Sequence, residues 1–142
     1  PGLILKCTPD DLDAVLQIWL ETNIAAHSFI PESYWRGNLE AVRAALPQAD
    51  VYVCTDEDGI AGFIGLDGSY IAGIFVRAEK QSRGAGRQLL DHAKRIRPAL
   101  TLHVYEQNAR AVRFYRAAGF SVRSAGVDDA TGAQEYEMVW PA

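Results

Sequence analysis

Cysteine, methionine and histidine are scarce in this sequence of 142 residues. It contains two cysteines, one methionine and three histidines, and the cysteines, Cys7 and Cys54, each lie in a short apolar run. Two isolated cysteines do not provide the spacing of a zinc site or the dense disulfide framework of a small secreted domain. We therefore expect two buried thiols and no bound metal.

A long apolar run and an excess of basic charge are also missing. No stretch approaches the ~18 apolar residues needed to cross a bilayer, and residues 1–6 lack the basic and then apolar layout of a signal peptide. These absences predict a cytoplasmic protein that does not bind membranes. The net charge of -4 argues against a nucleic-acid-binding protein, because such proteins carry excess lysine and arginine to neutralise phosphates.

What the sequence does have is ordinary hydrophobicity and an uneven distribution of charge. Hydrophobic residues make up 49% of the chain and charged residues 23%, and the length predicts a single domain over residues 1–142. Residues 1–76 hold 11 acidic and 3 basic residues, whereas residues 77–142 hold 7 acidic and 11 basic residues. A basic half suits an anionic ligand and an acidic half a cationic one, but solvated surface charge explains the same pattern.

The first half of the chain predicts a strand, two helices and an antiparallel meander. Residues 3–7 form the strand pattern, and Thr8 and Pro9 then provide a helix start, followed by an apolar helical face over residues 12–23. A weaker helical pattern covers residues 35–46. Three short apolar runs follow, separated by turns rich in aspartate and glycine. We expect strands at residues 51–55, 60–66 and 70–76.

The second half predicts alternating helices and strands. Residues 87–96 form a helical pattern that Pro98 ends, and Asn108 is placed to cap a second helix, whose apolar face includes Tyr115. Gly119 stands where a left-handed helix C-cap is expected. We expect strands at residues 100–105, 120–127 and 134–140. This order predicts an α/β or α+β fold with a mixed sheet and helices on its faces.

A turn suited to phosphate lies between a predicted strand and a predicted helix, at residues 80–87. Helix N-termini present free backbone N–H groups, so anions bind there readily. The turn combines two glycines, which permit close approach, with three basic side chains: Gly84, Gly86, Lys80, Arg83 and Arg87. It is neither a dinucleotide fingerprint, since Leu89 replaces the third glycine, nor a P-loop. Such glycines are also ordinary in a purely structural turn.

This turn is joined to a second motif further along the chain. The combined pattern is Gln81-x-x-Gly84-x-Gly86 after Phe75-Val76, then Leu102-His103-Val104, then Asn108-x-x-Ala111-x-x-Phe114-Tyr115-x-x-x-Gly119-Phe120. The combination resembles the GNAT superfamily of N-acetyltransferases, over essentially the whole chain. The resemblance implies a mixed, mostly antiparallel seven-stranded sheet with helices on both faces. Four further segments look similar to small bacterial acetyltransferases of peptidyl lysine: 27–30, 34–35, 104–108 and 140–141.

The resemblance implies direct transfer of an acetyl group from acetyl-coenzyme A to a primary amine, without a metal and without a covalent enzyme intermediate. The turn would bind the coenzyme diphosphate, and the pantetheine arm would pair with the exposed edge of residues 74–76. The residues assigned to the cofactor are Phe75, Val76, Gln81, Ser82, Arg83, Gly84, Ala85, Gly86, Arg87, Asn108 and Tyr115.

Two side chains are assigned to proton transfer. A lysine with a pKa of about 10.4 is almost fully protonated at pH 7, so a base must help the amine to attack. His103 aligns with a position where some relatives carry a catalytic glutamate, and it is the expected base, with Glu106 and His27 in reserve. A packed or solvent-facing histidine is the alternative. Tyr115 matches the family's general acid, although tyrosines on apolar helix faces often only pack.

The acceptor is predicted from the acidic half of the chain and from an aromatic connector. His27, Phe29, Tyr34 and Trp35 would suit a cationic amine on an apolar stem, such as a lysine side chain, although such aromatics also commonly build a core. A small amine, such as an antibiotic or polyamine, is the alternative acceptor. A non-catalytic domain that senses acetyl-coenzyme A is the alternative to an enzyme. The acyl chain, and the choice between monomer and homodimer, stay open.

Overall fold

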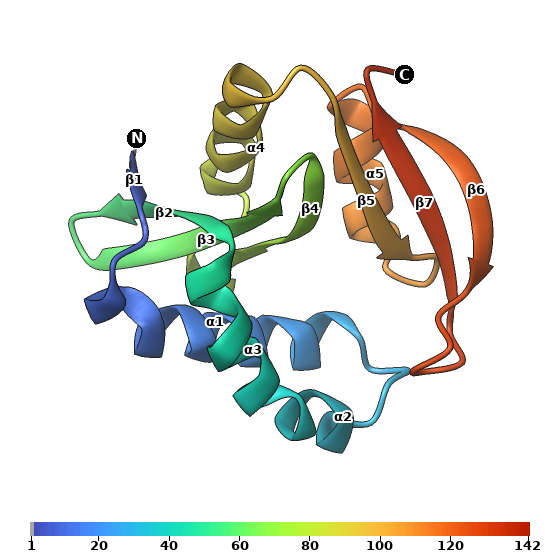
Figure 1. Ribbon diagram of the computed structural model, residues 1–142, viewed down its shortest axis with the longest axis horizontal. Coiled ribbons are helices and arrows are strands. Elements are labelled where there is room, and N and C mark those ends of the chain that lie inside the picture. Colours follow the sequence, from blue (N-terminus) through green and yellow to red (C-terminus); the bar gives the residue numbers. More distant parts are fainter. Residues whose placement is uncertain (1) are drawn as a thin grey trace.

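The computed structural model describes residues 2–142, which build a seven-stranded sheet of order β1-β2-β3-β4-β5-β7-β6 (Figure 1). The strands are β1 (Leu3–Lys6), β2 (Asp50–Asp56), β3 (Gly59–Asp67), β4 (Tyr70–Val76), β5 (Leu100–Tyr105), β6 (Ser121–Val127) and β7 (Gln134–Trp140). Neighbouring strands are antiparallel except β4 and β5, which are parallel. The predicted fold class is confirmed.

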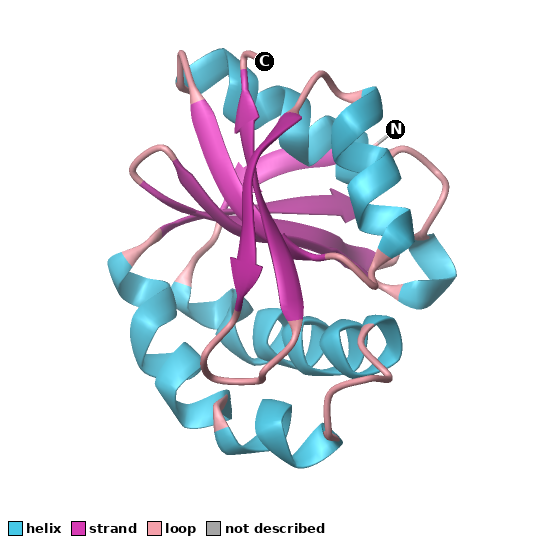
Figure 2. Ribbon diagram, turned by 90° about the vertical axis from the view of Figure 1, so that its right-hand side faces the viewer, coloured by secondary structure: helices cyan, strands magenta, loops and turns pink. Residues whose placement is uncertain are grey.

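Helices cover both faces of the sheet (Figure 2). One side carries α1 (Leu12–Ala26), α2 (Glu32–Gly37) and α3 (Leu39–Ala45), and the other carries α4 (Ala85–Ile96) and α5 (Ala109–Ala117). Short 3-10 turns lie at Pro9–Asp11, Leu46–Gln48 and Ala78–Lys80. Because successive strand residues point to opposite faces, β3 contributes to two cores. Phe63 packs with Val15 of α1, whereas Ile64 belongs to the core that Leu89 of α4 joins.

The second predicted helix is in fact two short helices that meet at Asn38. In a continuous α-helix the Asn38 N–H would bond to the carbonyl of Tyr34, four residues earlier. Here the Asn38 side-chain amide donates to that carbonyl at 2.6 Å, and the Asn38 N–H donates instead to Trp35 at 3.1 Å. The side chain therefore competes with the helical hydrogen bond and separates α2 from α3.

The two parallel strands pair over a very short length. Tyr70 and Ile71 of β4 lie opposite Thr101 and Leu102 of β5, and these are the register pairs between the two strands in the described chain. Beyond them β4 continues beside β3, while β5 continues beside β7, so the sheet divides in its middle (Figure 1). Residues 74–76 of β4 therefore have no strand partner on the side of β5 within residues 2–142.

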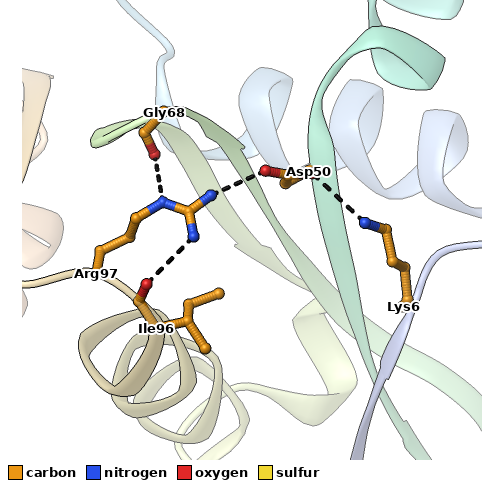
Figure 3. Close-up of polar contacts among 5 residues, drawn as sticks. All are labelled: Lys6, Asp50, Gly68, Ile96 and Arg97. Carbon is orange, nitrogen blue, oxygen red and sulfur yellow. Dashed lines mark hydrogen bonds and ion pairs between the residues drawn. The ribbon is translucent and has the colours of Figure 1, made fainter.

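Arg97 makes hydrogen bonds near the end at which β4 and β5 are paired (Figure 3). Its Nε donates to the Gly68 carbonyl at 2.9 Å, and its Nη2 donates to Asp50 Oδ2 at 2.8 Å. Lys6 reaches the same carboxylate, with Nζ 3.4 Å from Asp50 Oδ1. Because Gly68 precedes β4 and Arg97 precedes β5, the guanidinium ties together the starts of the two strands.

Among residues 2–142 there is no helix with both the length and the apolar character needed to cross a bilayer.

Candidate active site

A cavity of about 820 Å³ opens where β4 and β5 diverge. Its wall combines the last residues of β4, the turn before α4, the first half of α5 and the C-terminal end of α1. The lining residues are Thr22, Asn23, Ala25, Ala26, His27, Ile74, Phe75, Val76, Lys80, Gln81, Ser82, Gly84, Gly86, Arg87, Gln107, Asn108, Ala109, Arg110, Ala111, Phe114 and Tyr115. Segments distant in the sequence thus meet around one space.

Most residues predicted for the cofactor face this cavity. Those that line it are Phe75, Val76, Gln81, Ser82, Gly84, Gly86, Arg87, Asn108 and Tyr115. Arg83 is exposed and Ala85 is buried, and both lie outside the lining. Of the residues predicted for the acceptor or for the base, His27 lines the cavity. Phe29, Tyr34, Trp35, His103 and Glu106 do not.

The turn before α4 has an unusual backbone that leaves its N–H groups available. Ser82 and Gly84 both adopt the left-handed conformation, with φ of 63° and 91°. No side chain within residues 2–142 caps the N-terminus of α4, and its first turn contains no acidic residue. The Gln81 side chain donates to the Val76 carbonyl at 2.9 Å and so fixes the turn against the end of β4. Free N–H groups at the positive end of a helix dipole form an anion site.

Gly86 keeps the cavity open beside this turn. A Cβ built at Gly86 would lie 3.6 Å from the Phe114 ring and 3.8 Å from the Val76 side chain, both of which line the cavity. A methyl group at this position would thus occupy part of the space. The absence of a side chain at Gly86 therefore leaves this space in the cavity free.

Two of the basic side chains near the turn already have acidic partners. Lys80 Nζ lies 3.0 Å from Asp56 Oδ2 and 2.6 Å from Asp58 Oδ2. Hydrogen bonds to these carboxylates raise the pKa of Lys80, and the bond to Lys80 lowers the pKa of Asp56. Arg87 Nε lies 3.7 Å from Asp91 Oδ1.

Arg110 is a lining residue that the sequence analysis did not single out. Its Nη1 donates to Gln81 Oε1 at 2.5 Å, and its Nη2 donates to Ser82 Oγ at 3.1 Å. The side chain thus connects α5 to the phosphate turn. Its place in the first turn of the helix that Asn108 caps was the available signal in the sequence.

Tyr115 is placed by the cap of α5. The Asn108 Oδ1 accepts the Ala111 N–H at 3.3 Å, which starts the helix as predicted, and Tyr115 follows two turns later. The Tyr115 ring is buried between Phe114 and Phe120, with ring centroids 5.3 Å and 5.6 Å away. Burial raises the pKa of the Tyr115 phenol, so the hydroxyl is protonated at neutral pH. It makes no hydrogen bond to any residue between Gly2 and Ala142.

His27 lies at the C-terminal end of α1, in contact with the cap of α5. Its Nε2 is 3.2 Å from Asn108 Nδ2. Asn108 Oδ1 already accepts the Ala111 N–H, so the Asn108 amide nitrogen is the group that faces His27. This nitrogen is a donor, so His27 Nε2 accepts its hydrogen bond. The proton of the neutral imidazole therefore lies on Nδ1. Nδ1 is buried without a hydrogen-bond partner in the described chain. Burial lowers the pKa of His27, and the Asn23 backbone offsets part of that effect.

The aromatic residues predicted for the acceptor gather around His27. The His27 ring stacks on Trp35 at 5.2 Å and meets the edges of Phe29 and Tyr105 at 5.7 Å and 5.1 Å, while Tyr34 meets Trp35 at 5.0 Å. We call these five residues the aromatic cluster. Trp35 itself is buried, so the cluster supports one edge of the cavity at His27 rather than forming its wall.

His103 is exposed on β5 and lies outside the cavity lining. Strand alternation places it on the same face as Tyr105 and opposite the buried Leu102. Its Nδ1 is 3.0 Å from the Tyr70 hydroxyl of β4, next to the point where the strands part. Burial raises the pKa of Tyr70, and the charge of Glu135 adds to this.

The sequence analysis also predicted that the protein binds no metal and that both cysteine thiols are buried. No group of three or more metal-ligating side chains comes together within residues 2–142. The absence of a metal from the reaction stays a prediction. Both cysteines are free, and Cys54 is buried as expected, whereas Cys7 is only partly buried.

Comparison with known proteins identifies the family. A family model described as "Acetyltransferase (GNAT) domain" matches residues 47–122, which is more than half of the chain. The chain belongs to the GNAT family of acetyltransferases. As a GNAT protein it is an acyltransferase that acts on an amine nitrogen, and the predicted family is confirmed.

Relatives cover nearly the whole chain. It is 33% identical over 141 residues to the peptidyl-lysine N-acetyltransferase YiaC of Escherichia coli, covering 98% of this chain and 97% of YiaC. The solution structure of apo-form YjaB from Escherichia coli superposes with a TM-score of 0.87 at 30% identity, covering 99% and 97% of the two chains. The PaiA N-acetyltransferase of Thermoplasma acidophilum, solved in complex with coenzyme A, shares the fold, with a TM-score of 0.80, 19% identity and 98% coverage of both chains.

Proposed function

We propose that this GNAT enzyme transfers the acetyl group of acetyl-coenzyme A to the side-chain amine of a protein lysine. One observation carries the proposal: a single cavity at the division of the sheet is lined by both the anion-binding turn and Tyr115. The name of YiaC, a peptidyl-lysine N-acetyltransferase, supports the lysine acceptor.

The residues present fit a coenzyme A thioester. The cavity volume of about 820 Å³ lies within the range of small-molecule sites. At one end the free N–H groups of α4 suit a diphosphate. Along its wall, residues 74–76 offer a strand edge with which an amide-bearing arm can pair. At Gly86 the missing side chain leaves room for the bound molecule.

The chemistry assigns one proton transfer to Tyr115. Acetyl-coenzyme A supplies the acetyl group as a thioester, so the amine nitrogen forms a bond to the carbonyl carbon while the carbon–sulfur bond breaks. The protonated Tyr115 hydroxyl donates its proton to the departing sulfur and regains one from solvent. The hydroxyl has no protein partner among residues 2–142 that would compete for this proton.

The base that accepts the amine proton is proposed to be His103. Its Nδ1 contact with Tyr70 orients the imidazole beside the parting strands, and a water molecule would carry the proton across the remaining distance. His27 is the alternative base, because it lines the cavity and its ring is neutral. His103→Gln and His27→Gln decide between them: the base variant loses the acidic limb of the pH profile for kcat, and the other variant keeps it.

Tyr115→Phe tests the mechanism. We expect kcat to fall by roughly a hundredfold or more, because the general acid is removed, while the Kd for acetyl-coenzyme A changes little. Tyr136→Phe is the matched control, since Tyr136 packs against the same core and lies outside the cavity lining. Release of free thiol from acetyl-coenzyme A is the measurement. Equal kcat in Tyr115→Phe and wild type would remove Tyr115 from the mechanism.

The acceptor is tested by competition. Wild-type enzyme is given acetyl-coenzyme A with lysine-containing peptides and with small amines, including polyamines and amine antibiotics. Preferential acetylation of peptide lysine agrees with the proposal, and preferential acetylation of a small amine would replace the acceptor. Tight binding of acetyl-coenzyme A with no turnover on any acceptor would instead indicate a sensor.

A further inference from the structure

Asn23 is the one buried residue with an amide or charged side chain in the described part of the chain, and 5% of its surface is exposed. It lies near the C-terminal end of α1, whose other buried residues, Val15, Leu16 and Ile18, are apolar. Burying an amide costs free energy unless both its donor and its acceptor find partners. The two polar ends of Asn23 therefore need partners of their own.

One end of the Asn23 amide is paired and the other is free. Nδ2 donates to the Trp19 carbonyl at 2.9 Å, and because only the nitrogen can donate, this bond fixes which end of the amide is the oxygen. Oδ1 accepts no hydrogen bond from any residue between Gly2 and Ala142, yet the protein does not enclose it as it encloses His27 Nδ1. Since Asn23 lines the cavity, an acceptor without a protein donor faces this space.

The other polar side chains that the end of α1 contributes to the cavity already have partners. The Thr22 hydroxyl donates to the Ile18 carbonyl at 2.6 Å. His27 Nε2 accepts from the Asn108 amide, and His27 follows Asn23 by four residues, so both lie on one side of the helix. No charged side chain of α1 lines the cavity within residues 2–142. This wall thus offers one free, uncharged acceptor to an N–H donor.

We propose that Asn23 Oδ1 accepts a hydrogen bond from the acceptor amine and makes the enzyme select primary over secondary amines. This inference rests on the proposed function and specifies its acceptor. The coenzyme is assigned to the edge of β4, the turn before α4 and α5, which leaves the wall formed by α1 to the acceptor. His27, which the sequence predicts to bind the acceptor, lines the cavity at the same wall.

The reaction explains why two hydrogens on the amine matter. A neutral primary amine carries two. As the nitrogen bonds to the carbonyl carbon and the carbon–sulfur bond breaks, the base takes one hydrogen as a proton, Tyr115 protonates the sulfur, and the other hydrogen stays in the product amide. Asn23 Oδ1 accepts this second hydrogen and directs the lone pair of the nitrogen at the thioester. A secondary amine gives its single hydrogen to the base and turns an alkyl group toward Oδ1.

An uncharged acceptor also suits an amine that must lose its charge. A carboxylate in this position would favour the ammonium form and raise the pKa of the bound amine. The ammonium form has no lone pair with which to attack the thioester. The amide oxygen of Asn23 orients the amine without holding it protonated.

The experiment compares two peptides that are blocked at the N-terminus and differ only in carrying lysine or Nε-methyllysine. Asn23→Leu, which keeps the branched shape without the polar atoms, should lower kcat/KM for the lysine peptide by about 10- to 100-fold. It should lower kcat/KM for the methyllysine peptide far less, so the preference of the wild type for the primary amine shrinks. The Kd of acetyl-coenzyme A, measured by calorimetry, should stay unchanged.

Asn38→Leu is the matched control. The Asn38 side chain also donates to the carbonyl four residues earlier, that of Tyr34, and Asn38 lies outside the cavity lining. This variant loses the same kind of helical bond but no acceptor in the cavity, so it should keep the wild-type preference for the primary amine. Should Asn23→Leu fail to fold, Asn23→Ala removes the same oxygen with a smaller side chain and takes its place.

The outcomes separate the inference from the proposed function. A wild type that acetylates no amine overturns the proposed function. A wild type that acetylates the lysine peptide, with Asn23→Leu equal to it in kcat/KM and in preference, overturns the inference and leaves the proposed function in place. Weaker binding of acetyl-coenzyme A by Asn23→Leu with an unchanged preference also overturns the inference, because the oxygen then contacts the coenzyme.

Discussion

The neutral His27 ring, whose pKa burial lowers, contacts the side chain that caps α5. The Asn108 carbonyl oxygen is taken by the α5 cap, so the Asn108 amide nitrogen faces Nε2 of His27. A second ring proton would place two donors against each other. Protonation of His27 would therefore act on the cap of the helix that carries Tyr115.

We predict that the stability of the protein falls as the pH drops below about 6.5. The pKa of His27 is lowered in the folded state by burial, so the unfolded chain binds the proton more readily. The contribution of neutral His27 is then complete above the unfolded pKa and is lost as the pH falls toward the folded pKa. Urea unfolding of the free protein at several pH values measures this loss.

His27→Gln should flatten that pH dependence in part. Burial also lowers the pKa of His92, which therefore retains some of the effect. An unchanged slope in His27→Gln would show that His27 is not held neutral.

Much of the site's composition could be predicted from single residues, but its charge balance could not. Gly84, Gly86 and Asn108 are recognisable because a turn and a helix cap require their particular backbone or side chain. Lys80 pairs with Asp56 at the end of β2 and with Asp58 in the following turn, both distant from it in the sequence. Such pairing arises from the tertiary structure and has no local signal.

At the scale of elements, Arg97 ties β4 and β5 together at one end of their short pairing. It joins the turn before β4 to the residue that leads into β5, at the end where those strands are paired. The cavity begins beyond that end. Arg97 thus fixes the start of the strand whose other end lines the cavity.

Arg97→Ala should lower the free energy of unfolding by about 1–3 kcal/mol, because it removes the guanidinium from the Gly68 carbonyl and from Asp50 Oδ2 and leaves Asp50 with Lys6 alone. It should also weaken coenzyme A binding, since β4, whose end lines the cavity, loses its tie to β5. Arg95→Ala, on the exposed last turn of α4, is the control. Chemical unfolding and calorimetry measure the two effects, and a variant as stable as Arg95→Ala would contradict the role of Arg97.

Element bounds followed the sequence where local pattern and turn residues agreed. Strands β4, β5 and β7 begin and end as predicted, because β4 and β5 are rich in apolar and β-branched residues, β7 alternates polar with large apolar residues, and turn residues or helices bound all three. The break between α2 and α3 was not predicted. It depends on which acceptor the Asn38 side chain finds, a choice that periodicity does not report.

At the scale of the whole molecule, the acidic and the basic half of the chain contribute different elements around the cavity. The turn before α4, α4 itself and α5 belong to the basic half, and they surround the anion-binding end of the cavity. The acidic half contributes α1, α2 and α3 on the other face of the sheet (Figure 2). The distribution agrees with an anionic cofactor on one side and a cationic acceptor on the other.

Coenzyme binding should raise the stability of the entire fold. The cavity is lined by the end of β4 and by α5, which follows β5 in the chain, so a ligand there contacts elements on both sides of the division. At a hundredfold excess over Kd, acetyl-coenzyme A should add about 2.7 kcal/mol to the free energy of unfolding. Thermal unfolding with NAD and ATP as controls measures the effect. No shift with acetyl-coenzyme A, or an equal shift with all three, would contradict a site specific for the coenzyme.

The division between β4 and β5 also gives the protein a strand edge in the middle of its sheet. Outer edges are tolerated by many proteins, but any unpaired row of N–H and C=O groups can recruit another extended chain. Here the open row belongs to residues 74–76, and a bound coenzyme would cover it. Preparations freed of coenzyme should therefore aggregate faster on storage than saturated ones, because the bound coenzyme blocks pairing of this edge with another chain.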